Sequence, residues 1–551
     1  MGMAIFGCKQ SESSSPPVIV EPVRPTPNAF SIVVAYGSEK KAWMEEQIAA
    51  FNQSTPKLPS GAAFTVAGKA MGSGEAMQDI LRGDLPATVY SPASEVYLTL
   101  LNDAWLTMPG HATALAPRGE SVVISPVVIA IWKPMAEGLG WPKKALGWGD
   151  VLKIVGDKRG WQAIGRPEWG RFKLGHTHPE YSTSGLLSVI AEAYAGAKKT
   201  RDLSPKDLAA AKTRAFLRDI EKGIVHYGKS TGFFADKMLT RGPSYLSAAV
   251  LYESSVIESY ANNRAGMDLV SIYPKEGTFW SDHPYAILDA PWVNADQRKG
   301  AEQFLAHLKA RPAQARALAL GFRPADPSLA IGAPIDAAHG ADPKQPQTLL
   351  AMPSAETVKT LLEVFREVKK PSDVTLIFDK SGSMRGQPLD EAKTGGQAFL
   401  KTLQPRDQVS LQLFDNQVYP IVGPVVVGQG IDDLLKRVGE IPAGGGTALY
   451  DAIASSYRDM KKRASADPAR IHALVVMTDG KDEHSTLSMQ DVLNLFPSGE
   501  TESDIKVFTI AYGQGAKGDV LPQIAEAGGG SHSQGDMKNI VQVYRDIASF
   551  F

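Results

Sequence analysis

Short, fully apolar runs alternate with amphipathic segments along the last third of the chain. Four of these runs have the length and composition of strands buried on both faces. They span residues 374–378, 408–414, 473–477 and 505–511, and helical patterns lie between them at 390–403, 448–464 and 489–495. This order predicts a doubly wound, mostly parallel α/β sheet over residues 371–551, with any ligand at the carboxyl ends of its strands.

A similar but less regular alternation runs from residue 28 to residue 335. A strand, a small polar loop and a helix follow one another three times, beginning at Phe30, Phe64 and Thr88. Further strands are expected at 122–132, 248–255, 269–273 and 286–288, and further helices at 186–197 and 297–310. Small polar residues open each of the early helices, where free N–H groups and the helix dipole favour an anion or another polar ligand. The N-terminal unit is therefore also α/β.

The overall charge balance conceals a difference between these two units. The 551 residues include 58 Lys and Arg against 59 Asp and Glu, which gives a net charge of −1. From Pro371 onward the net charge is −6, whereas the preceding part carries +5. A dedicated nucleic-acid binder would carry a basic excess, so we expect no nucleic-acid partner. The apolar runs are all shorter than the roughly 18 residues that a membrane-spanning helix requires, so no such helix is expected.

The single cysteine, Cys8, excludes a disulfide framework within the chain and a cysteine-cluster zinc site. It ends a short apolar run and precedes a Ser- and Pro-rich tract, so residues 1–27 are interpreted as a tether. The run Ile5–Cys8 resembles the end of a bacterial lipoprotein signal, which implies lipidation at Cys8. The prediction assumes a signal truncated at Met1, and a cysteine in a disordered tail is the alternative. The expected location is the bacterial cell envelope, outside the cytoplasm, with a lipid anchor as the only membrane attachment.

Oxygen-bearing side chains follow the predicted strands of the C-terminal unit. Asp379, Ser381 and Ser383 come directly after the first strand, and Asp479 comes after the third. Thr447 follows three glycines and precedes a helix. Carboxylate and hydroxyl oxygens are ligands that hard cations such as Mg²⁺ prefer. The alternative is that the two aspartates only cap helices.

This set resembles the von Willebrand factor A (VWA) domain and its metal-ion-dependent adhesion site (MIDAS). The motif D-x-S-x-S, a distant Thr and an Asp in a T-D-G turn are all present at the five positions just named. The resemblance implies that these residues bind Mg²⁺ (or Mn²⁺) and that a protein partner supplies an acidic residue to the metal. Lys380, inside the motif, is expected to point away from the site.

The N-terminal unit resembles bacterial extracellular solute-binding proteins, in particular the branch near molybdate binders. The resembling segments are 36–39, 72–74, 91–94, 182–185 and 252–253. The resemblance implies two α/β lobes joined by a hinge, with a small solute in the cleft between them. The candidate cleft residues are Ser38, Glu39, Ser73, Ser91, Ser94, Ser182, Thr183, Ser184, Tyr252 and Glu253. For each serine, an ordinary helix N-cap is the alternative.

Two further patterns are weaker. Residues 223–230 match the phosphate-loop pattern G-x-x-x-x-G-K-[ST], but a helical pattern precedes them where a strand is required, so no nucleotide site is predicted. His176 and His178 have the side chains of metal ligands but no obvious third partner, so a role in the loop is favoured.

Together these features predict a tether (1–27), a two-lobed solute-binding domain (28–335), a linker with a connecting helix (336–370) and a VWA domain (371–551). The favoured function is that of a non-enzymatic, surface-anchored binding protein. The alternative is the substrate-binding component of an ABC-type transport system. A hydrolase is disfavoured because the sequence places no nucleophile and base together.

Overall fold

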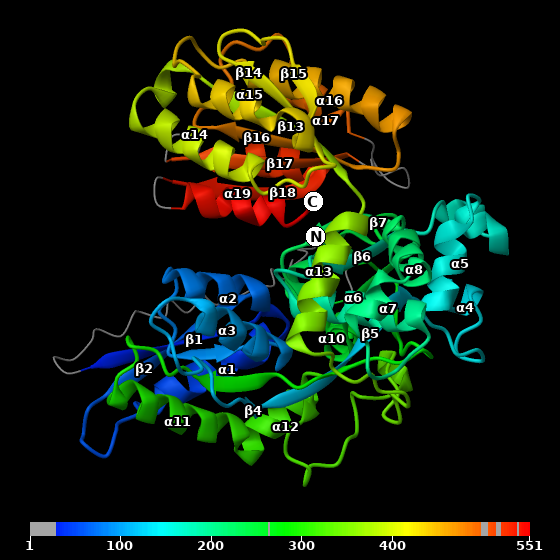
Figure 1. Ribbon diagram of the computed structural model, residues 1–551, viewed down its shortest axis with the longest axis vertical. Helices are drawn as coiled ribbons and strands as arrows, with labels where there is room; N and C mark the ends of the chain where they lie inside the picture. The colour runs from blue at the N-terminus through cyan, green and yellow to red at the C-terminus, as the bar shows by residue number, and fades with distance from the viewer. Residues whose placement is uncertain (1–28, 263–264, 497–504, 514–519, 537–538) are drawn as a thin grey trace, which may run out of the picture.

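The computed structural model describes residues 29–262, 265–496, 505–513, 520–536 and 539–551. The predicted tether and Cys8 lie outside these described residues. Three α/β bodies are visible in Figure 1: two lobes in the lower part of the view and a C-terminal domain above them. A continuous hydrophobic core includes residues from all three, among them Tyr90, Leu251 and Phe508.

The first lobe is built on a five-stranded sheet with the order β2-β1-β3-β11-β4. Strands β1 (Phe30–Gly37), β2 (Phe64–Met71) and β3 (Val89–Ser91) are parallel, whereas β11 (Pro284–Ile287) runs antiparallel to β3 and β4 (Glu120–Ser121). The helices of this lobe are α1 (Lys41–Gln53), α2 (Ser73–Arg82), α3 (Val96–Thr107), α11 (Ala295–Lys309) and α12 (Arg311–Ala319). Because β1, β2 and β3 are parallel, the helix starts that follow them lie along one edge of the sheet.

The second lobe contains a sheet with the order β10-β5-β8-β6-β7, and β9 and β12 also pair with β5. These strands are β5 (Val123–Trp132), β6 (Leu174–Thr177), β7 (Ile224–Gly228), β8 (Ala248–Tyr252), β9 (Leu269–Ile272), β10 (Trp280–Ser281) and β12 (Arg323–Pro324). Its helices are α4 (Lys133–Gly138), α5 (Trp148–Gly156), α6 (Thr183–Ala197), α7 (Pro205–Ala209), α8 (Ala211–Glu221), α9 (Thr231–Arg241) and α10 (Glu253–Ala261). The chain passes between the lobes at β4–β5, at β10–β11 and again before β12.

The starts of two helices in this lobe differ from the sequence prediction. Residues 183–185 belong to α6, and residues 253–255 belong to α10 rather than to a strand. Ser182 has extended backbone angles and ends the loop one residue before α6 begins. A Cβ atom at Gly185 would lie 1.9 Å from the carbonyl oxygen of Thr177, so the glycine lets α6 approach β6 closely.

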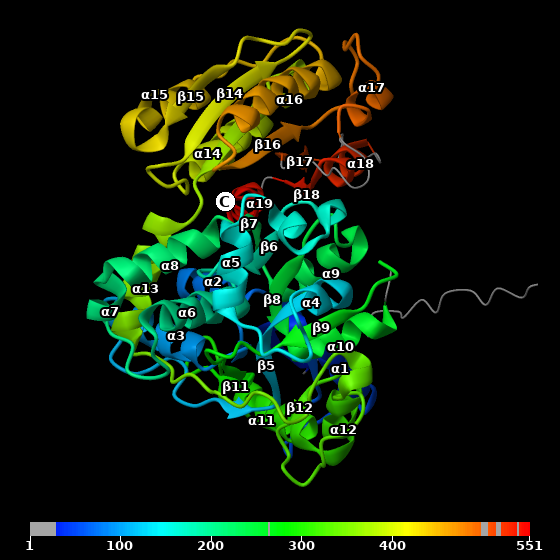
Figure 2. The same ribbon diagram turned by 90° about the vertical axis from the view of Figure 1, so that its right-hand side faces the viewer.

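The segment predicted as a linker packs along the second lobe. The backbone N–H of Leu350 donates to the carbonyl of Thr278, and Ser354 caps α13 (Ala355–Val368) by accepting from the N–H of Thr357. Helix α13 contacts α3 of the first lobe and α6, α7 and α8 of the second (Figure 2). The connecting helix therefore fastens both lobes together.

The C-terminal domain has a six-stranded sheet with the order β15-β14-β13-β16-β17-β18, and every neighbouring pair except β14 and β15 is parallel. The four predicted strands are β13 (Ser372–Asp379), β14 (Gln408–Phe414), β16 (Ile471–Thr478) and β17 (Ile505–Tyr512); the sequence prediction did not include the edge strands β15 (Val422–Val426) and β18 (Gly529–Gly535). Helices α14 (Gln387–Leu400), α15 (Val427–Gly439), α16 (Leu449–Ala466), α17 (Met489–Leu493), α18 (Val520–Ala527) and α19 (Ile540–Ala548) complete the domain.

The end of the C-terminal domain rests on the second lobe, beside β7 (Figure 2). The ring of Phe550 lies 5.6 Å from that of Phe233 and 5.9 Å from that of His226. An ion pair of 3.1 Å joins Lys229 to Asp546. We call this contact the interdomain seat.

Candidate functional site

The predicted metal-site residues lie on three loops at the carboxyl edge of the C-terminal sheet. Two backbone hydrogen bonds hold the first two loops together, from Gly382 N to Gly445 O (2.9 Å) and from Gly444 N to Lys380 O (2.8 Å). Gly445 has a φ of +82°, a backbone conformation that favours glycine. Loop geometry thus brings residues about 60 positions apart to one point.

The structure places four of the five predicted side chains in one hydrogen-bonded network. The backbone N–H of Ser381 donates to Asp379 Oδ1 (2.8 Å), and the hydroxyls of Ser381 and Ser383 lie 3.0 Å apart. Ser383 Oγ donates to Asp479 Oδ1 (2.8 Å). Thr447, the fifth, lies beside the T-D-G turn: a Cβ atom on Gly480 would be 3.5 Å from its hydroxyl oxygen.

Burial shifts the pKa values of the two carboxylates of this site. Burial raises the pKa of Asp379 to about 6, the hydroxyl of Thr478 opposes the shift, and the negative charge of Asp479 adds to it. Burial also raises the pKa of Asp479. A divalent cation would offset the cost of keeping two neighbouring carboxylates charged. Because Ser383 is exposed, the network opens to solvent on one side. These donors and this access fit a hard divalent cation.

Two expectations from the sequence, capping by Asp379 and the direction of Lys380, can be compared with the contacts at this site. Helix α14 begins at Gln387 and is capped by Gly386, so Asp379 does not cap it. Lys380 forms a buried ion pair with Asp415 and lies over the ring of Tyr419, with its nitrogen 4.7 Å from the ring centre. Its ammonium group is therefore engaged outside the network.

The predicted cleft residues of the two lobes meet in a closed seam. The N–H groups of Gly74 and Glu75, at the start of α2, donate to the carbonyl of Tyr181 in the other lobe (2.9 and 3.2 Å). Ser73 Oγ accepts hydrogen bonds from the hydroxyl of Thr183 across the seam (2.8 Å) and from the N–H of Ala93 (3.1 Å). The polar start of α2, where a ligand was expected, is thus satisfied by the chain itself.

A hydroxyl cluster continues the seam inside the second lobe. Thr231 lies 3.3 Å from Ser182 and 2.8 Å from Ser184, measured between hydroxyl oxygens, and Ser184 also lies 2.8 Å from Thr177. Thr231 is not among the residues predicted from the sequence, although it follows a strand and opens α9 as the predicted residues open their helices. The pattern that could have identified Thr231 is the strand before it. That strand, β7 (residues 224–228), lies inside the segment that matched the phosphate-loop pattern.

Both predicted cleft carboxylates are engaged in buried ion pairs. Glu39 contacts Lys40 and His283, each at 3.2 Å, and these partners lower its pKa to about 2 although burial alone would raise it. Glu253 accepts two hydrogen bonds from Arg323 (2.8 and 2.9 Å). Neither carboxylate is available as a free ligand group.

The remaining predicted residues differ in their surroundings. Ser91 is fully buried, and its hydroxyl has no hydrogen-bond partner. Tyr252 is fully buried near Thr231 and Ser281. Ser94 lies near the start of α3 and lines a separate cavity beside α13.

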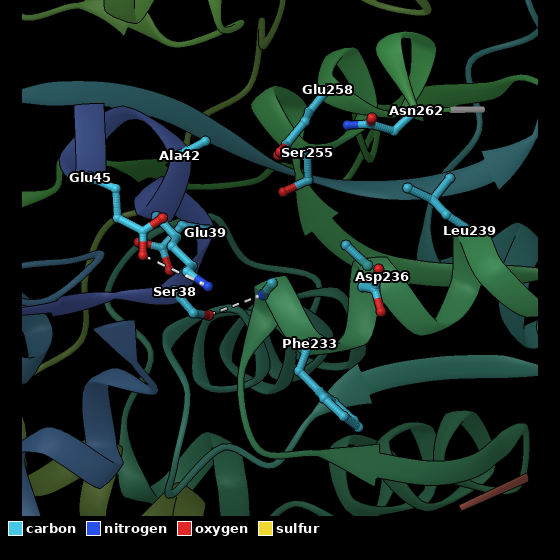
Figure 3. Close-up of a pocket in the computed structure, with 13 residues that line it drawn as sticks. Ser38, Glu39, Ala42, Glu45, Phe233, Asp236, Leu239, Ser255, Glu258 and Asn262 are labelled. Carbon is cyan, nitrogen blue, oxygen red and sulfur yellow. Dashed lines mark hydrogen bonds and ion pairs between the residues drawn. The ribbon is translucent and has the colours of Figure 1, made fainter. Parts of the chain in front are cut away.

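A cavity of about 500 Å³ lies at the edge of the seam, between α1 of the first lobe and helices α9 and α10 of the second (Figure 3). Ser38 closes one side, since its hydroxyl accepts from the N–H of Gly232 (3.1 Å). The lining includes the carboxylates of Glu45, Asp236 and Glu258, and Ser255 is buried in the wall. Lys41 also lines the cavity and pairs with Glu45 (3.8 Å), and the carboxyl groups of the lining outnumber this cation.

Comparison with known proteins identifies the two parts of the chain. Residues 32–323, just over half of the chain, match the family described as bacterial extracellular solute-binding protein. The chain belongs to the bacterial extracellular solute-binding proteins. Residues 373–544 match the von Willebrand factor type A domain. The two resemblances and the α/β fold class predicted from the sequence are confirmed. Domains of both kinds are generally non-catalytic binding modules, and solute-binding homologues are periplasmic or extracellular.

Two curated relatives match only part of this solute-binding protein. The uncharacterized protein sll0103 of Synechocystis sp. is 29% identical over 165 residues, which are 30% of this chain and 37% of that protein. The inter-alpha-trypsin inhibitor heavy chain H4 of Sus scrofa is 27% identical over 113 residues, 20% of this chain and 12% of that protein. The chain therefore spans well under half of each relative.

Solved structures show likeness to each part separately. A periplasmic thiamin binding protein is 12% identical to this chain. The match covers 61% of this chain and 96% of that protein, with a TM-score of 0.44. AfuA from Actinobacillus pleuropneumoniae is 14% identical, with coverages of 62% and 99% and a TM-score of 0.43. A von Willebrand factor type A protein from Catenulispora acidiphila is 20% identical, with coverages of 33% and 42% and a TM-score of 0.28. Among the described residues, no helix combines the length and apolar character needed to cross a bilayer.

Proposed function

We propose that this chain is a non-enzymatic binding protein of the bacterial cell envelope that holds a protein partner through a divalent cation in its VWA domain. The observation that carries the proposal is the network of Asp379, Ser381, Ser383 and Asp479, which is buried at its base and exposed at Ser383. Its donors are oxygens, as Mg²⁺ or Mn²⁺ requires.

In this proposal the five predicted residues, Thr447 included, hold the cation directly or through water. The bound cation would supply a positive centre that attracts a carboxylate of the partner. Exposed Arg385 and Lys481 lie two residues along the chain from Ser383 and Asp479. Exposed Glu483 also lies at the site, where its N–H donates to the carbonyl of Thr447 (2.8 Å), so the attraction of an acidic partner rests on the cation. In this proposal the specificity for acidic side chains would come from the bound cation and would not depend on a small-molecule cleft.

We also propose that lipidation at Cys8 anchors the protein and that residues 9–27 extend the two domains away from the membrane. Such a tether would make the VWA domain accessible to partners in the envelope. Conversion of Cys8 to Ser should release the protein from membranes if this anchor exists.

The transport alternative has less support than the adhesion proposal. The carbonyl of Tyr181 and the hydroxyl of Thr183 satisfy the start of α2, which is where a solute would need free donors. The acidic cavity of Figure 3 instead favours a second candidate function, the binding of a small cationic solute. A thermal shift with spermidine that disappears in Glu258→Gln would support it, and no shift in the parent protein would exclude spermidine-like ligands.

The main proposal is tested with Asp379→Asn, which removes a charge at nearly constant volume. We expect this variant to lose measurable Mg²⁺ binding in calorimetry and to lose Mg²⁺-dependent capture of a partner from envelope extracts. The matched control is Asp433→Asn, because Asp433 is an exposed aspartate of the same domain. Unchanged Mg²⁺ affinity in the folded Asp379→Asn variant would contradict the site, and capture that persists in chelator would contradict its role in adhesion.

A further inference from the structure

Three titratable side chains from distant parts of the sequence meet in the core of the second lobe, away from the VWA site. His176 lies on β6, Glu192 on α6 and Glu221 at the end of α8. Each is at most 1% exposed, and one ligand-capable atom of each lies within 4.8 Å of the others. No third partner of His176 was evident in the sequence, because both glutamates lie on helices that approach β6 only in the folded lobe.

Each of these three side chains has a second polar atom, and that atom is hydrogen-bonded to a group outside the cluster. His176 Nδ1 donates to the carbonyl of Thr177 (2.7 Å), which leaves Nε2 directed inward. Glu221 Oε2 accepts from the hydroxyl of Tyr227 (2.5 Å), and Glu192 Oε1 accepts from the hydroxyl of Ser188 (2.7 Å). Metal sites in proteins have this arrangement, in which outer hydrogen bonds orient each ligand and fix the histidine tautomer.

The inward atoms have no such complete set of partners. His176 Nε2 and Glu221 Oε1 lie 3.1 Å apart. Glu192 Oε2 is buried and accepts no hydrogen bond. A buried carboxylate oxygen without a partner is costly, so this oxygen requires either a proton or a cation. Burial raises the pKa of Glu192 to about 8, so without a cation the group is protonated at neutral pH. Ligand atoms around a tetrahedral ion with bonds of about 2.0–2.1 Å lie roughly 3.3 Å apart. The separation between His176 Nε2 and Glu221 Oε1 is close to this value, and the ligand atom of Glu192 lies within 4.8 Å of both.

We propose that His176, Glu192 and Glu221 form a buried binding site for a first-row divalent metal ion, best suited to Zn²⁺. Two carboxylates, a neutral imidazole and a divalent ion give no net charge, which suits a buried position. Three donors that include a nitrogen favour zinc over Mg²⁺ or Ca²⁺, which require six or more oxygen ligands. The ion would join β6, α6 and α8 and so stabilise the lobe behind the seam residues Ser182 and Ser184.

The test uses the full chain produced with added Zn²⁺ and then dialysed against chelator. We expect about one Zn²⁺ per chain by elemental analysis, since the site is buried, and an intense visible absorption of tetrahedral Co²⁺ when the protein is refolded with Co²⁺ instead. The double substitution Glu192→Gln/Glu221→Gln should abolish both signals. Asp379→Asn is the control, because it alters the VWA site alone and should retain both.

Melting temperatures measured with and without metal distinguish a metal site from a cluster of side chains that binds only protons. Without metal, Glu192→Gln should melt at or above the temperature of the parent, because it replaces a buried carboxyl group whose Oε2 has no hydrogen-bond partner. With Zn²⁺ bound, the parent should melt at a higher temperature than Glu192→Gln. Absence of both Zn²⁺ and the Co²⁺ absorption in the parent protein would overturn the proposal, as would equal metal content in the folded double variant.

Discussion

Glycines at the start of α2 allow the two lobes to touch. A Cβ atom at Gly74 would lie 2.1 Å from the carbonyl oxygen of Glu180, and one at Gly72 would lie 2.4 Å from that of Tyr181. Both obstacles are backbone atoms of the opposite lobe, so neither can move without displacing the β6–α6 loop. These two residues therefore fix how closely the lobes approach.

Substitution of Gly74 by Ala should open the seam. Overpacking of this kind costs about 1–3 kcal/mol of unfolding free energy, which chemical denaturation would measure. Gly156→Ala is a suitable control, since a Cβ atom there would have no other atom within 4 Å and the substitution should be neutral or slightly stabilising. Equal stability of the two variants would show that the seam is not closed in solution.

Individual residues also show why one site was easier to predict than the other. Asp379 ends one buried strand and Asp479 follows another, and the carboxyl ends of parallel strands lie at one edge of the sheet, so sequence order alone brings them together. Glu39 and Glu253 follow strands in the same way, but His283 contacts Glu39 and Arg323 forms an ion pair with Glu253, both from far along the chain. Such long-range ion pairs leave no local pattern.

At the level of elements, strands buried on both faces were predictable and edge strands were not. Strand β18 (Gly529–Gly535) contains Ser, His and Gln, and the apolar residues of β15 are interrupted by Gly423 and Pro424. Edge strands need pairing on one side only, and they tolerate polar residues and proline. Their place in the sheet depends on β14 and β17, which is tertiary information.

Helix α13 was predicted from its apolar positions, but its role as a fastener of both lobes depends on folded contacts. Leu361 is fully buried in it, and Lys359 forms an ion pair with Asp103 of α3. Leu361→Ala should lower the unfolding free energy by about 2–5 kcal/mol, because it leaves a cavity among the helices of the second lobe. Chemical denaturation of the full chain would measure this loss.

The exposed Glu363 on the same helix provides the matched control. Glu363→Ala should change the unfolding free energy by less than about 0.5 kcal/mol, as surface substitutions usually do. If Leu361→Ala were equally mild, α13 would be a loosely attached linker and the fastening role would be wrong.

For the whole molecule, the interdomain seat determines whether the VWA domain and the solute-binding domain act as one body. His226 lies at its centre, 2% exposed, with its Nδ1 donating to the carbonyl of Tyr227 (2.6 Å) and its Nε2 in contact with the hydroxyl of Tyr245. These two contacts satisfy a neutral imidazole. Protonation would add a charge among the cations of Lys506, Arg241 and Lys237.

Acid should therefore loosen the seat. Burial, followed by the charge of Lys506, lowers the pKa of His226 to about 3 in the folded chain, against 6.5 when it is exposed. The folded state then binds fewer protons than the unfolded state between these values, so stability is complete above pH 6.5 and falls as the pH decreases toward 3. At pH 5 the loss from this group is about 2 kcal/mol.

His226→Asn isolates this contribution from that of other buried histidines, because asparagine can donate and accept but does not titrate in this range. We expect the variant to be less stable than the parent at pH 7 and to lose less stability between pH 7 and pH 5. Since Phe550 packs against His226, separation of the domains should relieve the added charge before either domain unfolds. Small-angle X-ray scattering should then show expansion of the parent, but not of the variant, near pH 5. Identical pH profiles for the two proteins would mean that the seat does not respond to this histidine.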